Sequence, residues 1–174
     1  MTPFVVSIVG LHDVGKTKLI SRVIPALADR GYRVGTVKHA PHLSVMDPSG
    51  TRPDTARHLQ AGALRTLLAA EDGMVLQWPA TADMYVSSVI ARQFADVDIV
   101  LVEGLKHGPF PKIEVFRRTS EVAAEPLAGQ IDVLAVITDE RVALHDGVPR
   151  FSPQQTERIA DFIADLACQY WDAA

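Results

Sequence analysis

The sequence contains a single cysteine, Cys168, among its 174 residues. One cysteine cannot form a disulfide within the chain, which excludes disulfide-stapled scaffolds and favours a reducing compartment. No apolar run approaches the roughly 18 residues that a membrane-spanning helix requires. The N-terminus also lacks the charged segment that opens a secretory signal. We therefore expect a cytoplasmic protein that does not work in a membrane.

The chain also carries little net charge, −4, with 22% charged residues. This balance gives no overall positive field for a nucleic-acid duplex, so we expect no nucleic-acid partner. The sequence has no internal repeat and no low-complexity tract. Its length and its 48% hydrophobic content are enough for one domain with a core. We predict a single nucleotide-binding domain spanning residues 1–174.

The first 40 residues predict a strand, a helix and a second strand. The run FVVSIV (Phe4–Val9) is short, apolar and β-branched, which is typical of a strand buried on both faces. From Thr17 to Arg30 the apolar residues recur at helical spacing, and Gly31 is a plausible helix C-cap. The run Tyr32–His39 predicts the second strand, which completes a βαβ unit with a right-handed crossover.

The rest of the chain continues the alternation of strands and helices. Val97–Gly104 and Ile131–Glu140 predict two further buried strands, whereas the alternating run Lys112–Arg118 predicts a more exposed one. Asp146-Gly147 is a hairpin turn signal, and Ser152 is a candidate N-cap for a final helix. We further expect helices at 55–61, 82–94 and 153–170, and two short strands at 63–70 and 73–78. The fold class predicted is α/β: a P-loop NTPase three-layer sandwich with a mostly parallel central sheet and a β-hairpin or meander extension.

A phosphate-binding loop follows the first strand. The run GLHDVGKT, residues 10–17, fits the pattern G-x-x-x-x-G-K-[ST] and lies between a predicted strand and a predicted helix. In such loops the backbone N–H groups bind phosphate oxygens, the lysine reaches the terminal phosphates and the hydroxyl binds Mg²⁺. The helix N-terminus adds its positive end. We therefore predict a nucleotide site formed by Gly10, Leu11, His12, Asp13, Val14, Gly15, Lys16, Thr17 and Lys18, with Lys16 also catalytic.

Two residues of this loop are unusual for it. The carboxylate of Asp13 beside a triphosphate is unfavourable unless it points away or meets a cation, so it can weaken nucleotide affinity. His12 has two interpretations, a solvated loop residue or a contact to phosphate or to a partner.

A carboxylate is expected near the metal and the attacking water. Glu103 ends a predicted buried strand, where a Walker B carboxylate lies, and we predict it as the Mg²⁺-linked or water-orienting catalytic group. Asp98 opens the same strand and is predicted to be structural. Asp54 is either a further, water-mediated Mg²⁺ contact or the N-cap of a short helix.

The segment ITDE follows the last buried strand, at the position where many GTPases recognise the base. The usual Asn-Lys-x-Asp is absent. Asp139, together with Thr138, is our candidate for hydrogen bonds to guanine, and turn chemistry after a strand is the alternative.

Several basic residues have both a functional and a simpler interpretation. Lys38 and His39 end the second strand and are candidates for a phosphate or pterin contact; metal binding by His39 with His42 is disfavoured because no acidic or cysteine cluster accompanies them. Arg57 either pairs with Asp54 or meets an anionic ligand. Lys106 and Lys112 belong to a basic stretch that is either a solvated surface or a contact for a cofactor or partner.

Four segments together with the phosphate loop resemble one family. They are RVGTVKHAPH (33–42), DTARHLQAGA (54–63), VLVEGLKHGPFPKIEVFR (100–117) and ITD (137–139). They resemble the MobB family of molybdopterin-guanine dinucleotide biosynthesis adaptor proteins over most of the chain. The sequence departs from the family pattern at His12, Asp13, Val14 and Lys18 in the loop, and at Pro53 before Asp54.

The resemblance implies a SIMIBI-type P-loop fold, an interwoven homodimer, GTP binding with Mg²⁺ and weak GTPase activity. It also implies partnership with MobA, the guanylyltransferase, and possible contact with molybdopterin. The expected function is a GTP-binding adaptor in molybdenum cofactor biosynthesis, at most a slow GTPase because no arginine finger is evident. Two other classes share the loop: a small-molecule kinase, which would need an acceptor pocket and a lid, and a metallochaperone-type GTPase, which would need a Cys/His cluster.

Overall fold

The computed structural model of the chain describes residues 2–40, 54–79, 85–118, 125–145 and 147–173. These residues fall into two compact units. Unit 1 lies within residues 1–39 and 90–174, and unit 2 lies within residues 40–89. The single domain expected over residues 1–174 stays a prediction. No helix among the described residues is long and apolar enough to cross a membrane.

Unit 1 is built around a six-stranded sheet with the order β2-β5-β1-β6-β7-β8, in which every pair of neighbouring strands is parallel. The strands are β1 (Phe4–Val9), β2 (Val34–Lys38), β5 (Ile99–Glu103), β6 (Lys112–Val115), β7 (Ala135–Ile137) and β8 (Arg150–Phe151). The helices are α1 (Lys16–Asp29), α3 (Val86–Gln93, which enters unit 1 at Ile90), η1 (Leu127–Gly129, a 3₁₀ turn) and α4 (Thr156–Asp172).

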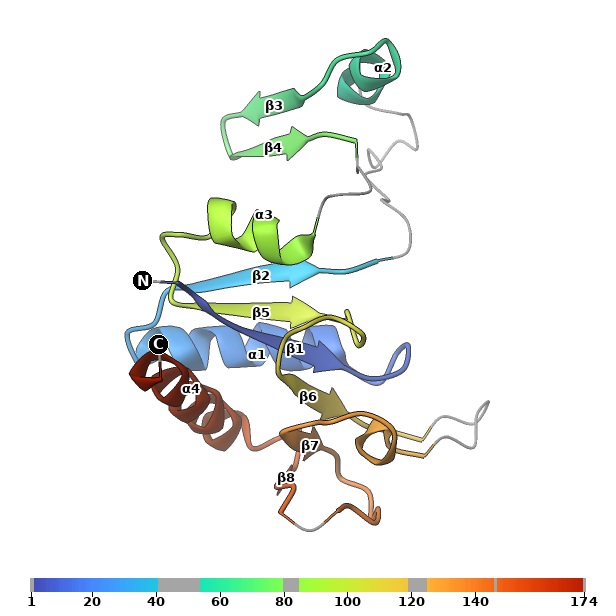
Figure 1. Cartoon of the computed structure of the whole chain (residues 1–174), viewed down its shortest axis with the longest axis vertical. Helices are drawn as coiled ribbons and strands as arrows, with labels where there is room; N and C mark the ends of the chain where they lie inside the picture. Colours follow the sequence, from blue (N-terminus) through green and yellow to red (C-terminus); the bar gives the residue numbers. More distant parts are fainter. Residues whose placement is uncertain (1, 41–53, 80–84, 119–124, 146, 174) are drawn as a thin grey trace. The chain divides into compact units, whose positions relative to one another are not determined.

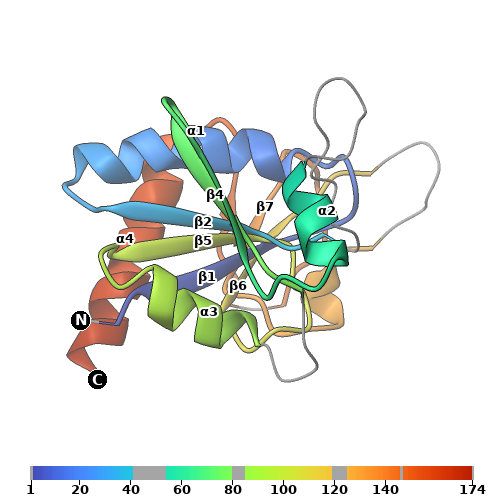
Figure 2. The same ribbon diagram turned by 90° about the horizontal axis from the view of Figure 1, so that it is seen from above.

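Helices cover both faces of this sheet. Helices α1 and α4 pack against each other on one face, and the part of α3 that belongs to unit 1 lies over the other (Figures 1 and 2). The central strands are apolar and β-branched because both of their faces are buried. The largest hydrophobic cluster joins β1, β5 and β7 to the inward faces of α1 and α4. The expected α/β fold with a mostly parallel sheet is confirmed.

The strand order places a crevice beside the phosphate loop. After β1 the chain crosses to β2 on one side, whereas after β6 it moves outward to β7 on the other side. Because β1 and β6 are neighbours, the connections that follow them run in opposite directions and leave a crevice at the carboxyl ends of the two strands. In open α/β sheets, ligands bind in such a crevice.

The expectation that Lys112–Arg118 forms an exposed strand is wrong. Strand β6 pairs with β1 on one edge and with β7 on the other, and Ile113, Glu114 and Val115 are buried. The alternation in the sequence comes from Glu114, whose buried carboxylate accepts hydrogen bonds from the backbone N–H groups of Leu127 (2.7 Å) and Ala128 (3.0 Å). A charged residue therefore lies inside the sheet because it anchors the η1 turn.

The C-terminal third also differs from expectation. Strand β7 has three residues instead of the predicted ten, and β8 pairs with it in parallel. The predicted hairpin turn at Asp146-Gly147 includes Asp146, which lies outside the described residues, so it stays a prediction. The predicted N-cap at Ser152 is wrong, because α4 begins at Thr156 after Gln155. Ser152 and Gln155 instead form a turn, in which the Gln155 N–H donates to the Ser152 carbonyl (2.9 Å).

Unit 2 contains the short helix α2 (Asp54–Gln60) and an antiparallel hairpin of β3 (Thr66–Ala70) and β4 (Gly73–Gln77). These elements confirm the expected short helix and the pair of strands. The Thr55 hydroxyl on α2 donates to the side-chain oxygen of Gln77 (3.3 Å), which ties the helix to the end of β4.

Because the carboxyl group of Glu114 is buried, we expect the free energy of unfolding to depend on pH. Burial raises the pKa of this carboxyl above its ordinary 4.5, although the two backbone N–H donors partly oppose the shift. Above pH 4.5 the unfolded chain then binds fewer protons at this site than the folded chain, so the contribution of Glu114 to stability falls as pH rises. Urea unfolding of the wild type and Glu114→Gln, compared from pH 4.5 to 8, should show the wild type losing stability relative to the variant. A difference that stays constant with pH would contradict the prediction.

Gly10 predicts a second stability effect, because a Cβ atom there would lie 2.3 Å from the Val115 carbonyl oxygen and its φ is +143°. The residue must therefore be glycine for the loop to pass the end of β6. Gly10→Ala should destabilise the protein by more than about 2 kcal/mol in denaturant unfolding. Gly129→Ala is the matched control, since a Cβ atom there would have no neighbour within 4 Å. An equal loss of stability in both variants would show that the clash at Gly10 is not the cause.

Candidate functional site

The phosphate loop has the expected context between β1 and α1. Gly15 takes a left-handed conformation (φ 100°) and the helix begins immediately after it, at Lys16. Asp13 also has a positive φ, 58°, which is uncommon for a residue with a side chain. The loop therefore turns sharply enough to bring backbone N–H groups and the N-terminus of α1 to one place.

Lys16 lies over this loop. Its ammonium donates hydrogen bonds to the carbonyl oxygens of Gly10 (3.1 Å) and Leu11. Burial lowers the pKa of Lys16, the Glu103 carboxylate opposes that shift, and the positive charge of Lys38 adds to it. Lys16, Lys38 and Glu103 thus act on one another electrostatically beside the loop.

Glu103 is the centre of a hydrogen-bonded cluster at the carboxyl end of the sheet. The Thr17 hydroxyl lies 2.9 Å from both of its carboxylate oxygens, and the Lys38 ammonium lies 2.8 Å from Oε1. The strand register explains the contact, since β2 and β5 pair Lys38 with Glu103 and β1 places Ile8 against the same residue. The last side chains of two neighbouring parallel strands and the first turn of α1 therefore meet at one point.

The environment keeps Glu103 ionised. Burial raises its pKa, but the hydrogen bonds from Lys38 and Thr17 and the nearby positive charge of Lys16 outweigh burial, so the net pKa lies below the ordinary value. A carboxylate held in its charged form can bind a cation or orient a water molecule.

The donor set at Glu103 and Thr17 fits Mg²⁺. Both residues offer oxygen ligands, and in phosphate sites this ion typically takes one or two protein oxygens together with phosphate oxygens and water. Within the described part of the chain there is no group of three or more His, Cys, Asp or Glu residues that could hold a metal ion.

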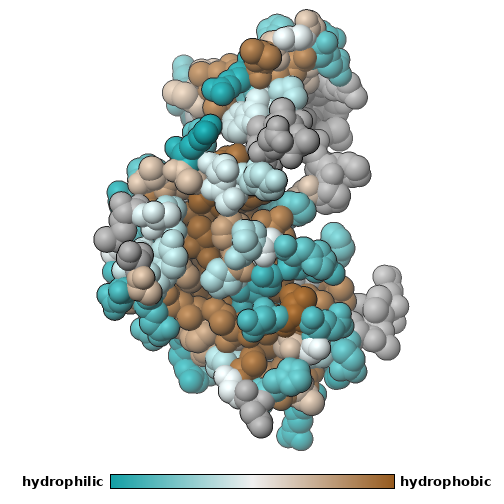
Figure 3. All heavy atoms as spheres, in the orientation of Figure 1, coloured by the Kyte–Doolittle hydropathy of each residue, from teal (hydrophilic) through white to brown (hydrophobic). Residues whose placement is uncertain are grey.

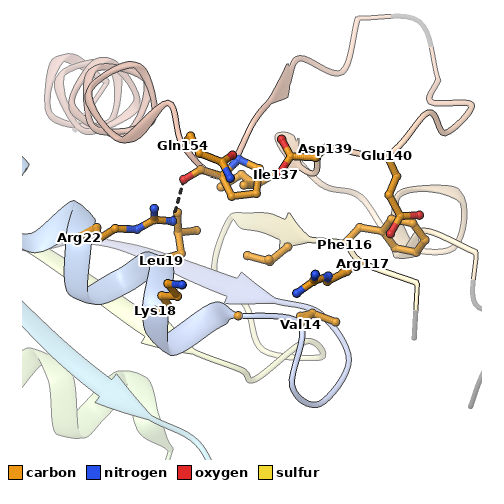
Figure 4. A pocket seen from close by; sticks show the side chains of 13 residues that line it. Val14, Lys18, Leu19, Arg22, Phe116, Arg117, Ile137, Asp139, Glu140 and Gln154 are labelled. Atoms are coloured by element: carbon orange, nitrogen blue, oxygen red, sulfur yellow. Dashed lines mark hydrogen bonds between the residues drawn. The ribbon is translucent and has the colours of Figure 1, made fainter. Parts of the chain in front are cut away.

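A cavity of about 510 Å³ lies on the other side of the loop (Figure 4). Its walls come from the loop and the first turns of α1, from the segments after β6 and β7, and from the turn before α4. The lining residues are Val14, Gly15, Lys18, Leu19, Arg22, Val115, Phe116, Arg117, Ile137, Asp139, Glu140, Pro153 and Gln154. Its lining mixes apolar side chains with charged and polar ones, a combination that can both contact and orient a small molecule.

Asp139 lies in this cavity and its carboxylate is held in place. The Ser152 hydroxyl donates to its Oδ1 at 2.6 Å, and the Gln154 amide nitrogen, in the orientation that satisfies its hydrogen bonds, donates to Oδ2 at 3.1 Å. Thr138 is buried and its hydroxyl accepts the Glu140 N–H (3.0 Å), which is turn chemistry after a strand. Of the two candidates for base contact, the structure thus places Asp139 in the cavity, whereas the Thr138 hydroxyl serves the turn.

Positive charge also lines the cavity. Arg22 on α1 donates to the Pro153 carbonyl oxygen (2.7 Å), a contact that joins α1 to the turn before α4 (Figure 4). Its Nε is buried and has no hydrogen-bond partner in the described part of the chain. Lys18 and Arg117 contribute two further cations to the lining.

Other predicted residues have simpler surroundings. Asp98 is structural as predicted, since it accepts hydrogen bonds from the backbone N–H (2.8 Å) and guanidinium of Arg33. Lys112 donates to the carbonyls of Gly108 and Phe110, and therefore stabilises the loop before β6. His39 and Lys106 are exposed.

Asp54 and Arg57 belong to unit 2. Asp54 is the first residue of α2, and its carboxylate pairs with the Arg57 guanidinium at 3.5 Å. The simpler interpretation of Arg57, an ion pair with Asp54, is therefore confirmed. The role of Asp54 toward Mg²⁺ stays a prediction.

Sequence reasoning missed much of the cavity. The helix start predicted at Ser152 covers Gln154, which lines the cavity, and Ser152, which contacts Asp139. Arg22 and Phe116 belong to no motif in the sequence. The signal that points to them is their position: they follow the carboxyl ends of parallel strands or lie on the second turn of α1, where side chains face a switch-point crevice.

Known proteins resemble this chain over most of its length. The family described as "MobB: Molybdopterin guanine dinucleotide synthesis protein B" matches residues 5–139. The molybdopterin-guanine dinucleotide biosynthesis adapter protein of Escherichia coli K12 is 32% identical over 154 residues, covering 87% of this chain and 86% of that protein. Its Haemophilus influenzae counterpart is 33% identical over 162 residues, covering 90% and 85%.

A solved structure also resembles this chain. The crystal structure of a molybdopterin-guanine biosynthesis protein B has a TM-score of 0.69 and 32% identity, and the similarity covers 94% of this chain and 99% of that one. The match over residues 5–139, which includes the phosphate loop, Glu103 and Asp139, shows that this chain belongs to the MobB family.

Proposed function

We propose that the protein is a cytoplasmic GTP-binding adaptor in molybdopterin guanine dinucleotide biosynthesis, which assists the guanylyltransferase MobA. The observation that carries the proposal is the cluster at the phosphate loop: Lys16 over the loop, and Thr17 within 2.9 Å of Glu103, in a chain of the MobB family. The names of the E. coli and H. influenzae relatives support the pathway.

The phosphates and the base of bound GTP would contact two different sets of residues. The loop N–H groups and Lys16 bind the β- and γ-phosphates, and Thr17 and Glu103 would hold Mg²⁺, which neutralises charge on those phosphates. The base enters the cavity beside α1, where Asp139 accepts hydrogen bonds from guanine N1 and N2. Apolar side chains such as Val14 and Phe116 then contact the flat faces of the base or the ribose.

We propose slow hydrolysis as the only chemistry. Within the part of the chain that the structure describes, the cations placed at the terminal-phosphate end are the lysines Lys16 and Lys38. A lysine is a point charge without the planar fork by which an arginine finger spans two oxygens. The bound nucleotide therefore has time to be presented to MobA, and contact with the molybdopterin phosphate is a further proposal.

We also propose a homodimer, joined at least in part through the β3–β4 hairpin. Both faces of this hairpin are apolar and exposed: Leu67 and Leu76 share one face, while Leu68 and Val75 share the other. Figure 3 shows apolar surface over these strands. A two-stranded hairpin is marginal alone, and a contiguous exposed apolar patch marks an interaction surface. A second copy would cover it.

The first prediction from this proposal concerns nucleotide affinity. Titration calorimetry with Mg²⁺ should give tighter binding of GTP than of ATP, and Lys16→Ala should weaken GTP binding at least about tenfold, because a charge-assisted contact to phosphate is lost. Asp139→Asn should reduce the preference for GTP over ATP. Equal affinity for both nucleotides would remove the role of Asp139, and absence of binding to either would remove the proposed function.

The second prediction concerns the oligomeric state. Light scattering should give the wild type twice the 18.9 kDa mass of one chain. The double variant Leu67→Glu with Leu76→Glu should be monomeric, because dimerisation would bury unpaired charges. Arg141→Glu, an exposed charge change in unit 1, is the control and should stay dimeric. A dimer that survives both hairpin substitutions would show that the interface lies elsewhere.

A further inference from the structure

The two groups assigned to Mg²⁺ are already engaged within the chain. Both carboxylate oxygens of Glu103 lie 2.9 Å from the Thr17 hydroxyl, and Oε1 also accepts from the Lys38 ammonium at 2.8 Å. The ammonium therefore occupies a coordination direction of the carboxylate that a cation would need. A divalent ion can bind Oε1 fully only when Lys38 releases it.

Of the two partners, Lys38 is the one that can move. Its side chain is 63% exposed, whereas that of Glu103 is 14% exposed. Glu103 is also the last residue of a buried strand, and its backbone carbonyl accepts the His39 N–H (3.0 Å). A lysine carries its charge on a flexible four-carbon stem, so the ammonium can swing out while the carboxylate stays in place.

We propose that Lys38 competes with Mg²⁺ for Glu103, so that the ion binds well only together with an anionic polyphosphate that takes over the Lys38 ammonium. The polyphosphate half of this inference rests on the proposed function. The competition itself rests only on the contacts among Thr17, Lys38 and Glu103.

The charges explain why the two ligands would cooperate. Lys16 and Lys38 both lie near one carboxylate, so a divalent ion entering alone meets two like charges and one opposite charge. A triphosphate reverses this balance, because its oxygens accept both ammonium groups and leave Glu103 and Thr17 free for the ion. Each ligand therefore raises the affinity for the other, which is a reciprocal coupling.

The experiment measures Mn²⁺ binding without nucleotide by electron paramagnetic resonance of the free ion. The variants are Lys38→Met, which keeps the length and removes the charge, and Lys38→Arg, which keeps the charge. Lys38→Met should bind Mn²⁺ at least about fivefold more tightly than the wild type, because the competing ion pair is lost. Lys38→Arg should bind as weakly as the wild type.

Lys106→Met is the matched control, since it removes an exposed lysine just after β5 that has no contact to Glu103 in the described part of the chain. It should leave Mn²⁺ affinity unchanged. Equal Mn²⁺ affinity for the wild type and Lys38→Met would overturn the proposal. So would equal tightening in Lys106→Met or Lys38→Arg, because the effect would then be one of overall charge or of packing.

A second measurement tests the coupling. The fold-increase in GTP affinity on adding Mg²⁺ should be smaller in Lys38→Met than in the wild type, since part of the coupling has been removed. An unchanged or larger increase would overturn the polyphosphate half. If the wild type binds no GTP at all, the proposed function fails, and the Mn²⁺ result still decides whether Lys38 competes for Glu103.

Discussion

The site depends on the parallel pairing of β1 between β5 and β6. Parallel strands have their carboxyl ends at the same edge of the sheet. This pairing therefore places the phosphate loop after Val9, the carboxylate of Glu103 and the segment after Val115 side by side at that edge. On one side of β1 lies the cluster of Thr17, Lys38 and Glu103, and on the other side lies the cavity that contains Asp139. The chemistry on each side is different because the neighbours of β1 are different.

Burial of the sheet holds these strand ends and their side chains in a fixed arrangement. Strands β1, β5 and β6 are almost completely buried, and α1 packs on them through Leu19, Val23 and Leu27. A close-packed interior holds the strand ends in fixed positions. The polar groups then reach the edge from rigid elements, which is how Glu103 can receive Thr17 and Lys38 at hydrogen-bond distance.

The sequence predicted the parts of the molecule that have local signals. The apolar run before Gly10 and the helical spacing after Thr17 predicted β1 and α1, and the order of buried strands predicted the α/β class. Local signals failed where a distant partner decides the outcome. The alternating pattern of the run around Glu114 predicted a more exposed strand, yet the N–H groups of η1 make the burial of its carboxylate tolerable. Ser152 has the chemistry of a helix N-cap, but Asp139 takes its hydroxyl. The pairing of Lys38 with Glu103 needed the strand register, which no spacing along the chain specifies.

The contact between Arg22 and Pro153 has a consequence for the synthesis of the protein. One wall of the cavity comes from α1 near the beginning of the chain, and the opposite wall comes from the turn that precedes the last helix. A nascent chain on the ribosome therefore exposes the phosphate loop long before the residues that close the cavity have been made. A ligand that must contact both walls of the cavity can therefore bind only after both segments have been synthesised.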